Sequence, residues 1–455
     1  MNFYEEKKEF IERIVDEIHQ IPMNQIIETR VPLPKKSGNS YLGICPFHRA
    51  SHYGAFVVTP SKGIWKCFAC GDGFAGDAIK FVSLYDGINW LDAAFKIAGE
   101  QGLASFEELQ RYSKGNSAKE AKRLEKKYQP QEKNTVKKVA QVGICDLAYD
   151  VLADMSPLTE MQKKYLREER RLPEYRLSDY FNFPSNWKLK DKIVQTIINV
   201  GVAPDVLVYV PGFYFDKKRE KISFGGCKGI GIKIHNAFLQ TTGIQIRRMD
   251  LKEGQSRYTW LSSSFAVDNT EEYSGGASCG SQKDVLYPSV NNNGNLCITE
   301  GRFKSERIVA SGNMSISVQG VSAWRGIDKT VRDIEKTHWV KQFFVMFDAD
   351  MFINKGVFDH SLSLAKMLQK NFPGTPVSYV VWPEEKGKGI DDLLIAGNGR
   401  YLKKKSVEET ETKYNKVYSQ VLSMFGVTSV KEVPDSDLER FESTLLHGME
   451  NAILA

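Results

Sequence analysis

Two pairs of potential metal ligands lie in the stretch CPFHRASHYGAFVVTPSKGIWKCFACG. Two residues separate Cys45 from His48, and two separate Cys67 from Cys70. Turns of this spacing can aim four side chains at one ion, and Zn²⁺ takes thiolate and imidazole ligands in a closed tetrahedron. The pattern therefore predicts one structural zinc, whose binding would help a small subdomain to fold. The alternatives are a redox Cys-x-x-Cys motif, which would not need a second pair at matching spacing, and chance spacing.

Basic and aromatic residues near the second ligand pair are candidates for a nucleic-acid surface. Lysines can contact phosphates, and aromatic rings can stack on bases. The alternative is that the aromatic residues pack the small core. The candidates are Lys62, Trp65, Lys66 and Phe68.

Acids at strand ends form the second group with chemical potential. The apolar stretch QFFVMF is followed by Asp348 and Asp350, and the strand-like NLCIT is followed by Glu300. Carboxylates at the rim of apolar strands are costly unless something uses them, and converging carboxylates repel unless a cation lies between them. Carboxylate oxygens suit Mg²⁺ or Mn²⁺, which bridge to phosphates. We therefore predict a divalent-cation site at these three acids; solvated loop acids are the alternative.

Strand and helix patterns alternate around these acids. NLCIT, SISVQG, FFVMF and PVSYVVW each precede a helical pattern, which is typical of a parallel sheet covered by helices. Such sheets place ligands at the carboxyl ends of their strands, so the three acids should share one edge.

The 455 residues are too many for one core, so we expect a multidomain α+β protein. The predicted parts are a zinc-binding domain at 1–105, a charged linker at 106–139, a helical then β-rich basic region at 140–292, a parallel α/β sheet at 293–400 and a helical tail at 401–455. Seven cysteines without an export signal argue against disulfides. No apolar run is long enough to cross a membrane, and we expect a cytoplasmic protein. The net charge of +6 permits a nucleic-acid partner without demanding one.

The segment from Arg30 to Ala98 resembles the zinc-binding domain of bacterial DnaG-type primases. The similar stretches are RVPLPKKSGNSYLGICPFH, KCFACG and GDAIKFV. The resemblance implies that the two Cys/His pairs are the zinc ligands. RASHYGAF departs from the family, which usually has a Thr-Pro-Ser turn there.

The acidic region resembles the TOPRIM fold of primases, topoisomerases and some nucleases. Glu300 matches its Glu-Gly position, and Asp348 with Asp350 matches its Asp-x-Asp position. KGIDDLL is similar to a further acidic stretch of primases, which adds Asp391 and Asp392 as candidate catalytic residues.

Lys304 departs from the DnaG-type pattern, which has aspartate at this position. TEGRFKSE is closer to a branch found in plasmid and phage primase-like proteins, which has lysine. The number of catalytic metals is therefore open, and Lys304 could instead neutralise a triphosphate.

The β-rich region also resembles primases, in the stretches GIQIRRMD, SRYTWLSSS and SQKDVLYP. Arg247, Tyr258 and Lys283 match family positions. Basic neighbours without a firm match are Arg248, Arg257, Lys228 and Lys233. These residues are candidates for nucleotide or nucleic-acid binding, and a solvated strand face is the alternative for each.

The order of ribbon, basic region and TOPRIM implies a DNA primase of the DNA-directed RNA polymerase type. It would make short primers from nucleoside triphosphates on single-stranded DNA, for replication of a mobile element. Whether the primers are RNA or DNA stays open. Residues 401–455 would either dock on a replicative helicase or cap the sheet. The alternatives are a TOPRIM metal-dependent nuclease and a non-catalytic zinc-containing single-stranded DNA-binding protein.

Overall fold

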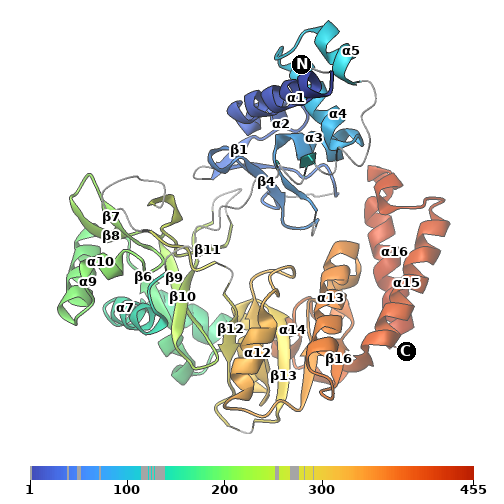
Figure 1. The fold of residues 1–455 in the computed structure, drawn as a ribbon. Helices are drawn as coiled ribbons and strands as arrows, with labels where there is room; N and C mark the ends of the chain where they lie inside the picture. The colour runs from blue at the N-terminus through green and yellow to red at the C-terminus, as the bar shows by residue number, and fades with distance from the viewer. Residues whose placement is uncertain are drawn as a thin grey trace. The chain divides into compact units, whose positions relative to one another are not determined.

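The computed structural model divides into two compact units, residues 1–135 and 136–455 (Figure 1). The structure describes residues 3–37, 40–48, 53–70, 73–113, 121, 124–125, 128, 139–251, 256–266, 276–280, 282–290 and 292–454. Most of the linker predicted at 106–139 lies outside these residues; within it, Phe106–Ser113 forms helix α5. No helix in the described ranges combines the length and apolarity that a bilayer span requires.

The first unit is a small antiparallel sheet packed against helices. The strands are β1 (Lys35–Ser37), β2 (Ser40–Gly43), β3 (Phe56–Thr59), β4 (Ile64–Cys67) and β5 (Ala75–Gly76), paired in that order. The helices are α1 (Phe3–Gln20), α2 (Met23–Glu28), α3 (Ala78–Asp86) and α4 (Trp90–Glu100). Helix α3 begins at an N-cap, because Asp77 Oδ1 accepts a hydrogen bond from the Lys80 amide at 2.7 Å.

The second unit begins with helices around a four-stranded antiparallel sheet. The helical segments are α7 (Val142–Asp154), α8 (Glu160–Lys164), a π-helical turn (Tyr165–Glu169), η3 (Glu174–Asp179), α9 (Trp187–Asn199) and α10 (Pro204–Leu207). The sheet order is β11 (Tyr258–Trp260), β10 (Thr241–Arg247), β9 (Gly229–His235) and β6 (Tyr180–Phe183). A separate hairpin joins β7 (Phe213–Asp216) and β8 (Lys221–Phe224).

A six-stranded sheet follows. Its order is β12 (Asp284–Leu286), β14 (Met314–Val318), β13 (Asn295–Glu300), β15 (Gln342–Val345), β16 (Val377–Val381) and β17 (Lys403–Ser406). The four inner strands are parallel, as their alternation with α11 (Arg302–Ala310), α12 (Ile327–Glu335), α13 (Lys355–Asn371) and α14 (Ile390–Ile395) predicts.

The two outer strands of this sheet are antiparallel, which the sequence did not reveal. Strand β17 reads KKKS, and lysines on an edge strand discourage pairing with another chain. Helices α15 (Val407–Met424) and α16 (Asp435–Leu454) pack on each other (Figure 1). Tyr414 on α15 and Phe441 on α16 are fully buried in the core of this sheet.

Candidate functional site

The four predicted zinc ligands converge. One ligand atom from each of Cys45, His48, Cys67 and Cys70 lies within 4.8 Å of all the others. His48 Nδ1 is 2.9 Å from Cys70 Sγ, and the sulfurs of Cys45 and Cys70 are 3.5 Å apart. Bonds of about 2.3 Å in a zinc tetrahedron require sulfurs about 3.8 Å apart, so small shifts would accommodate the ion. The Phe47 amide also donates to Cys45 Sγ at 3.4 Å, which suits a thiolate.

Trp65 does not lie on a nucleic-acid surface. It is fully buried, packs on Phe56 and Phe81, and donates its indole N–H to the Asp77 carbonyl at 2.9 Å. The prediction that Trp65 binds nucleic acid is wrong, and the alternative that it packs the core is correct. Phe68, by contrast, is half exposed with Lys66 Nζ 5.1 Å from its ring.

The ribbon carries two further lysine–aromatic pairs that the sequence reading missed. Lys35 Nζ lies 4.4 Å from the Tyr53 ring, and Lys36 Nζ lies 5.3 Å from the Tyr41 ring. The Lys36–Tyr41 pair follows from the register of β1 and β2, in which these two residues lie opposite each other. Tyr53 lies outside both strands, so its contact with Lys35 depends on how the chain folds before β3.

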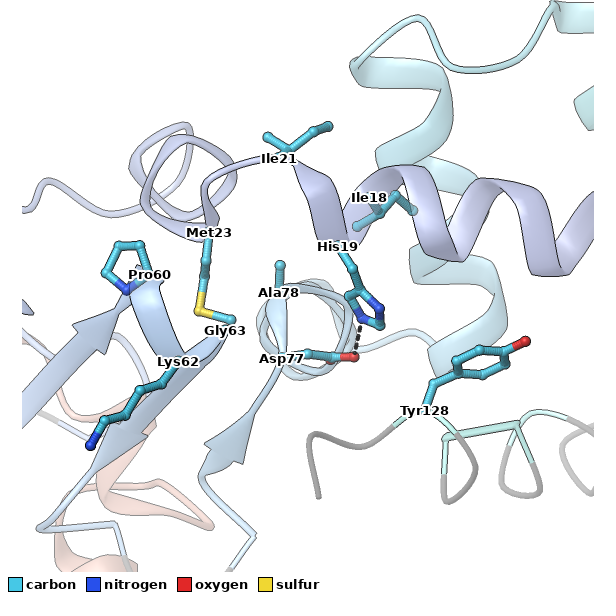
Figure 2. Close-up of a pocket in the computed structure, with 10 residues that line it drawn as sticks. All are labelled: Ile18, His19, Ile21, Met23, Pro60, Lys62, Gly63, Asp77, Ala78 and Tyr128. Atoms are coloured by element: carbon cyan, nitrogen blue, oxygen red, sulfur yellow. Dashed lines mark hydrogen bonds and ion pairs between the residues drawn. The ribbon is translucent and has the colours of Figure 1, made fainter. Parts of the chain in front are cut away.

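A cavity of about 200 Å³ lies among α1, the turn before β4 and the start of α3 (Figure 2). Lys62 lines it, and Figure 2 shows His19 and Asp77 facing each other across an ion-pair contact. His19 Nε2 is 3.0 Å from Asp77 Oδ2, while the other oxygen of Asp77 caps α3. Asp77 is only 2% exposed, so its contact with His19 links α1 to α3 in the interior of this unit.

The three predicted acids lie at one edge of the six-stranded sheet. Glu300 is the last residue of β13, and Asp348 and Asp350 follow β15, the parallel neighbour of β13. Burial, and then the charges of Asp348 and Asp350, raise the pKa of Glu300. Burial also raises the pKa of Asp348. The edge therefore concentrates negative charge, as the sequence predicts.

Two lysines occupy this acidic edge. Lys304 Nζ pairs with Asp348 Oδ1, and Lys388 Nζ lies 2.6 Å from Asp350 Oδ2. Burial alone would lower the pKa of Lys304, but the Asp348 and Glu300 carboxylates raise it. Within the described ranges, the zinc cluster is the only group of three or more His, Cys, Asp or Glu residues whose ligand atoms all lie within 4.8 Å of one another. The oxygen donors suit a hard divalent cation, but the lysines must move aside for one to bind.

The two adjacent acids on α14, Asp391 and Asp392, have different surroundings. Asp391 is 8% exposed and lines a cavity next to Asp348. Gly389 makes room for it, because a Cβ there would lie 2.5 Å from Asp391 Oδ1 and 3.0 Å from Lys304 Cε. Asp392 is exposed and accepts a hydrogen bond from the Gly389 amide at 3.4 Å, so it caps α14.

The cavity beside the acids has a volume of about 470 Å³. Its lining residues are Arg170, Gln245, Ser256, Tyr258, Trp260, Glu300, Gly301, Arg302, Phe303, Lys304, Gln319, Gly320, Asp348 and Asp391. Acids and Lys304 form one part of the wall, and aromatic rings with a guanidinium form another. Such a cavity can hold a ligand that has both a ring and a charged group.

Arg170 is a cavity residue that the sequence reading missed. Its Nη1 lies 3.6 Å from Asp391 Oδ2, and its Nε donates to the Tyr165 hydroxyl at 2.6 Å. It directly follows the π-helical turn, and such turns are frequent at functional sites. In the sequence, REERR reads as an ordinary charged helix, so only the irregular turn distinguishes this arginine.

The predicted basic residues have different places. Tyr258 lines the cavity, whereas Arg247 is 7% exposed behind it and donates to the Tyr258 hydroxyl at 3.0 Å. Arg257 is exposed one residue before Tyr258, and Arg248 and Lys283 are partly buried. Two others form ion pairs: Lys228 with Asp250, and Lys233 with Asp150.

An aromatic surface on α9 was also missed. Trp187 is 56% exposed, and three cations lie 5.2–5.8 Å from its ring: Arg219, Lys221 and Lys188. Arg219 and Lys221 come from the β7–β8 hairpin, which is far from Trp187 in the sequence. This distance explains why the surface was not recognised.

Residues 7–113 match the family described as CHC2 zinc finger, and residues 288–401 match a domain of unknown function, DUF3854. The DNA primase of Aquifex aeolicus (strain VF5) is 44% identical over 89 residues, which cover 19% of this chain and 17% of that protein. The DNA primase of Rickettsia bellii (strain RML369-C) is 39% identical over 85 residues, covering 19% and 14%. A crystal structure of the zinc-binding and RNA polymerase domains of Aquifex aeolicus primase aligns over 97% of both chains, at 18% identity and a TM-score of 0.40.

Proposed function

We propose that this chain, whose residues 7–113 form a CHC2 zinc finger and which is related in part to bacterial DNA primases, is itself a DNA primase of the DNA-directed RNA polymerase type. The observation that carries the proposal is the combination in one chain of this zinc ribbon with an acidic edge that opens on a nucleotide-sized cavity. In this proposal residues 140–292 are the basic part of the polymerase core, and residues 293–400 are the TOPRIM catalytic domain. The edge strands β12 and β17 lie just outside the bounds predicted for the TOPRIM domain and belong to the same sheet.

The substrates would be nucleoside triphosphates. Mg²⁺ or Mn²⁺ held by Glu300, Asp348 and Asp350 would stabilise charge on the reacting phosphate and on the leaving pyrophosphate. The protein's own cations serve the same end: Lys304 lies on the acidic side of the cavity, and Arg170 faces Asp391. Both are placed to balance a triphosphate, while Tyr258 and Trp260 offer rings beside it.

The second substrate would be a single-stranded DNA template. Trp187 is an exposed ring beside three cations, two of which, Arg219 and Lys221, also pair with Asp191. An exposed ring next to basic side chains is an arrangement that stacks bases and binds phosphates. The Lys66–Phe68 pair and the Lys35–Tyr53 pair of the ribbon have the same chemistry. Four ligands close the zinc site, so the zinc shapes this ribbon and does not react.

The cellular setting belongs to the same proposal. A primase works in the cytoplasm beside a replicative helicase, and α15 with α16 is the segment that would contact it. The lysine at position 304 favours a plasmid or phage replicon as the source of the chain.

The test is an assay with labelled ribo- or deoxynucleotides, single-stranded templates and either Mg²⁺ or Mn²⁺. We expect short template-dependent products from the zinc-loaded chain. Cleavage of the template without synthesis would support a nuclease instead. Template binding with neither synthesis nor cleavage under any of these conditions would leave a DNA-binding protein and overturn the proposal.

A further inference from the structure

Two glutamine side chains meet in the wall of the acidic cavity. Gln245 lies on β10 of the four-stranded sheet, and Gln319 directly follows β14 of the six-stranded sheet. Gln245 Nε2 donates to Gln319 Oε1 at 2.7 Å, and both residues line the cavity. Gln245 is only 4% exposed, so its amide has been taken out of bulk water.

This amide pair is incompletely satisfied. Gln319 Nε2 is buried and has no hydrogen-bond partner among the described residues. A buried amide that lacks a partner destabilises the fold, whereas two apolar side chains of similar volume would join the sheets without this cost. The polar pair is therefore better explained by a ligand than by packing.

The chemistry of the pair narrows the ligand group. An amide offers both a donor and an acceptor, which matches a hydroxyl group. A phosphate offers acceptors only, and cations already serve it at Lys304 and Arg170. The faces of a base are served by the rings of Tyr258 and Trp260. Two groups are then left for the amide pair, the hydrogen-bonding edge of a base and a sugar hydroxyl.

The position of the pair agrees with a sugar. Val318, the last residue of β14, lies opposite Glu300 on β13. Gln319 is the next residue, so it lies close to the proposed catalytic carboxylate of Glu300. The sugar of a nucleotide is joined directly to the α-phosphate. A group this close to the acidic edge therefore reaches the sugar more readily than the base.

We propose that the Gln245–Gln319 amide pair hydrogen-bonds to the ribose hydroxyls of the nucleotide in this cavity and selects ribonucleotides. The proposal rests on the proposed function, because it requires a nucleotide at the acidic edge. A site built to bond a hydroxyl rejects an analogue that lacks it, since its own polar groups then stay unpaired. The chain would accordingly make RNA primers.

The test measures binding of ATP and dATP to the zinc-loaded full chain in Mg²⁺ by isothermal titration calorimetry, without template. We expect ATP to bind at least about tenfold more tightly than dATP. Gln319→Leu and Gln245→Leu should each bring the ratio of the two affinities close to one, because they weaken the binding of ATP and leave the binding of dATP unchanged. Gln342→Leu is the matched control: Gln342 bonds Asn295 at 2.8 Å at the opposite end of the same sheet, and its loss should leave the ratio unchanged.

An equal affinity of the unaltered chain for ATP and dATP, or an unchanged ratio in both variants, would overturn the proposal. If a leucine variant fails to fold, Gln319→Asn shortens the side chain but keeps the amide, and the same loss of ratio is expected. Failure of the wider function is distinguishable: a chain that makes no primer but loses its ATP preference in Gln319→Leu is a ribonucleotide-binding protein that is not a polymerase. If the chain makes primers and its preference for ATP is the same in Gln319→Leu, the role of the amide pair is rejected and the proposed primase function is not.

Discussion

Lys304 Nζ pairs with Asp348 Oδ1 at the carboxyl edge of the six-stranded sheet. The ammonium group of Lys304 is thus ion-paired with a carboxylate that we propose as a ligand of a divalent cation. The pair is mostly enclosed, with 18% of the lysine side chain and 23% of the aspartate side chain exposed. Metal binding at this edge must compete with a tethered ammonium group.

Lys304→Ala should therefore strengthen Mn²⁺ binding, by roughly tenfold, because an ion pair near a protein surface contributes on the order of 1 kcal/mol or more when partly buried. The same change should slow synthesis, since the triphosphate loses a cation. Mn²⁺ titration followed by electron paramagnetic resonance measures the first effect. Lys388→Ala is the control, because Lys388 is 61% exposed and should change the affinity much less. Equal Mn²⁺ affinity in Lys304→Ala and the unaltered chain would show that Lys304 does not compete.

Arg302 should dominate the stability of the second unit. Its fully buried guanidinium pairs with Asp179, Asp284 and Glu306. Arg302→Leu leaves the buried Asp284 without its ion-pair partner, while Asp179 and Glu306 keep Arg176. Breaking a buried ion pair in this way costs about 3–5 kcal/mol. Urea unfolding of this unit measures the loss. Arg167→Leu removes the exposed pair with Glu174 and should change stability little.

The same cluster sets a pH dependence. Burial alone would raise the pKa of Asp179 and of Glu306, but Arg302 and its neighbour Arg176 hold both below their ordinary values. A carboxyl with a depressed pKa in the folded state stabilises above its unfolded pKa, and this stability is lost as pH falls through the folded pKa. The free energy of unfolding of the unaltered chain should therefore fall in acid, and the third carboxyl, Asp284, whose pKa burial raises, should oppose part of this change. Arg302→Leu should show a flatter stability curve below about pH 5; parallel curves would contradict the assignment.

Removal of zinc should unfold the first unit selectively. The ligand cluster draws together the loop after β2 and the end of β4 in a unit with short strands, so metal binding contributes folding free energy directly. A chelator should lower the melting temperature of this unit and leave that of the second unit unchanged. Metal analysis should give one zinc per chain, and Cys67→Ser should abolish retention of the ion. A Cys67→Ser protein that keeps its zinc and its melting profile would refute the site.

Trp187 should contribute to binding of single-stranded DNA. Loss of a stacking ring costs on the order of 1–3 kcal/mol per base, so Trp187→Ala should weaken binding at least about fivefold. Fluorescence anisotropy with a labelled oligonucleotide measures this effect. Trp339 is 75% exposed and is the matched control, because no cation–ring contact is known for it among the described residues. Equal losses in Trp187→Ala and Trp339→Ala would indicate a nonspecific effect.

Local spacing made the zinc ligands and the acidic edge predictable. Cys45 and His48 need only a turn, and Glu300 and Asp348 need only the rule that parallel strands end at one edge. Periodicity likewise located the inner strands and their helices. The short antiparallel edge strands carry no such pattern, and β17 is a run of lysines.

Other parts of the site depend on contacts that a single sequence does not display. The sequence left open whether Trp65 lies on a nucleic-acid surface or packs the small core, and the sheet buries it. Arg170 is aimed by a π-helical turn, and the Gln245–Gln319 pair joins two different sheets. Asp391 and Asp392 are adjacent in sequence, but helix geometry turns one into the cavity and the other onto the helix end.

The most direct test of the account is template-dependent primer synthesis by Asp348→Ala alongside the unaltered chain, with binding of single-stranded DNA measured on the same preparations. The account predicts products from the unaltered chain and none from Asp348→Ala, while both bind DNA equally. Asp359→Ala, which removes an exposed acid paired with Lys355, should keep full synthesis. Undiminished synthesis by Asp348→Ala would contradict the assignment of the acidic edge as the catalytic centre.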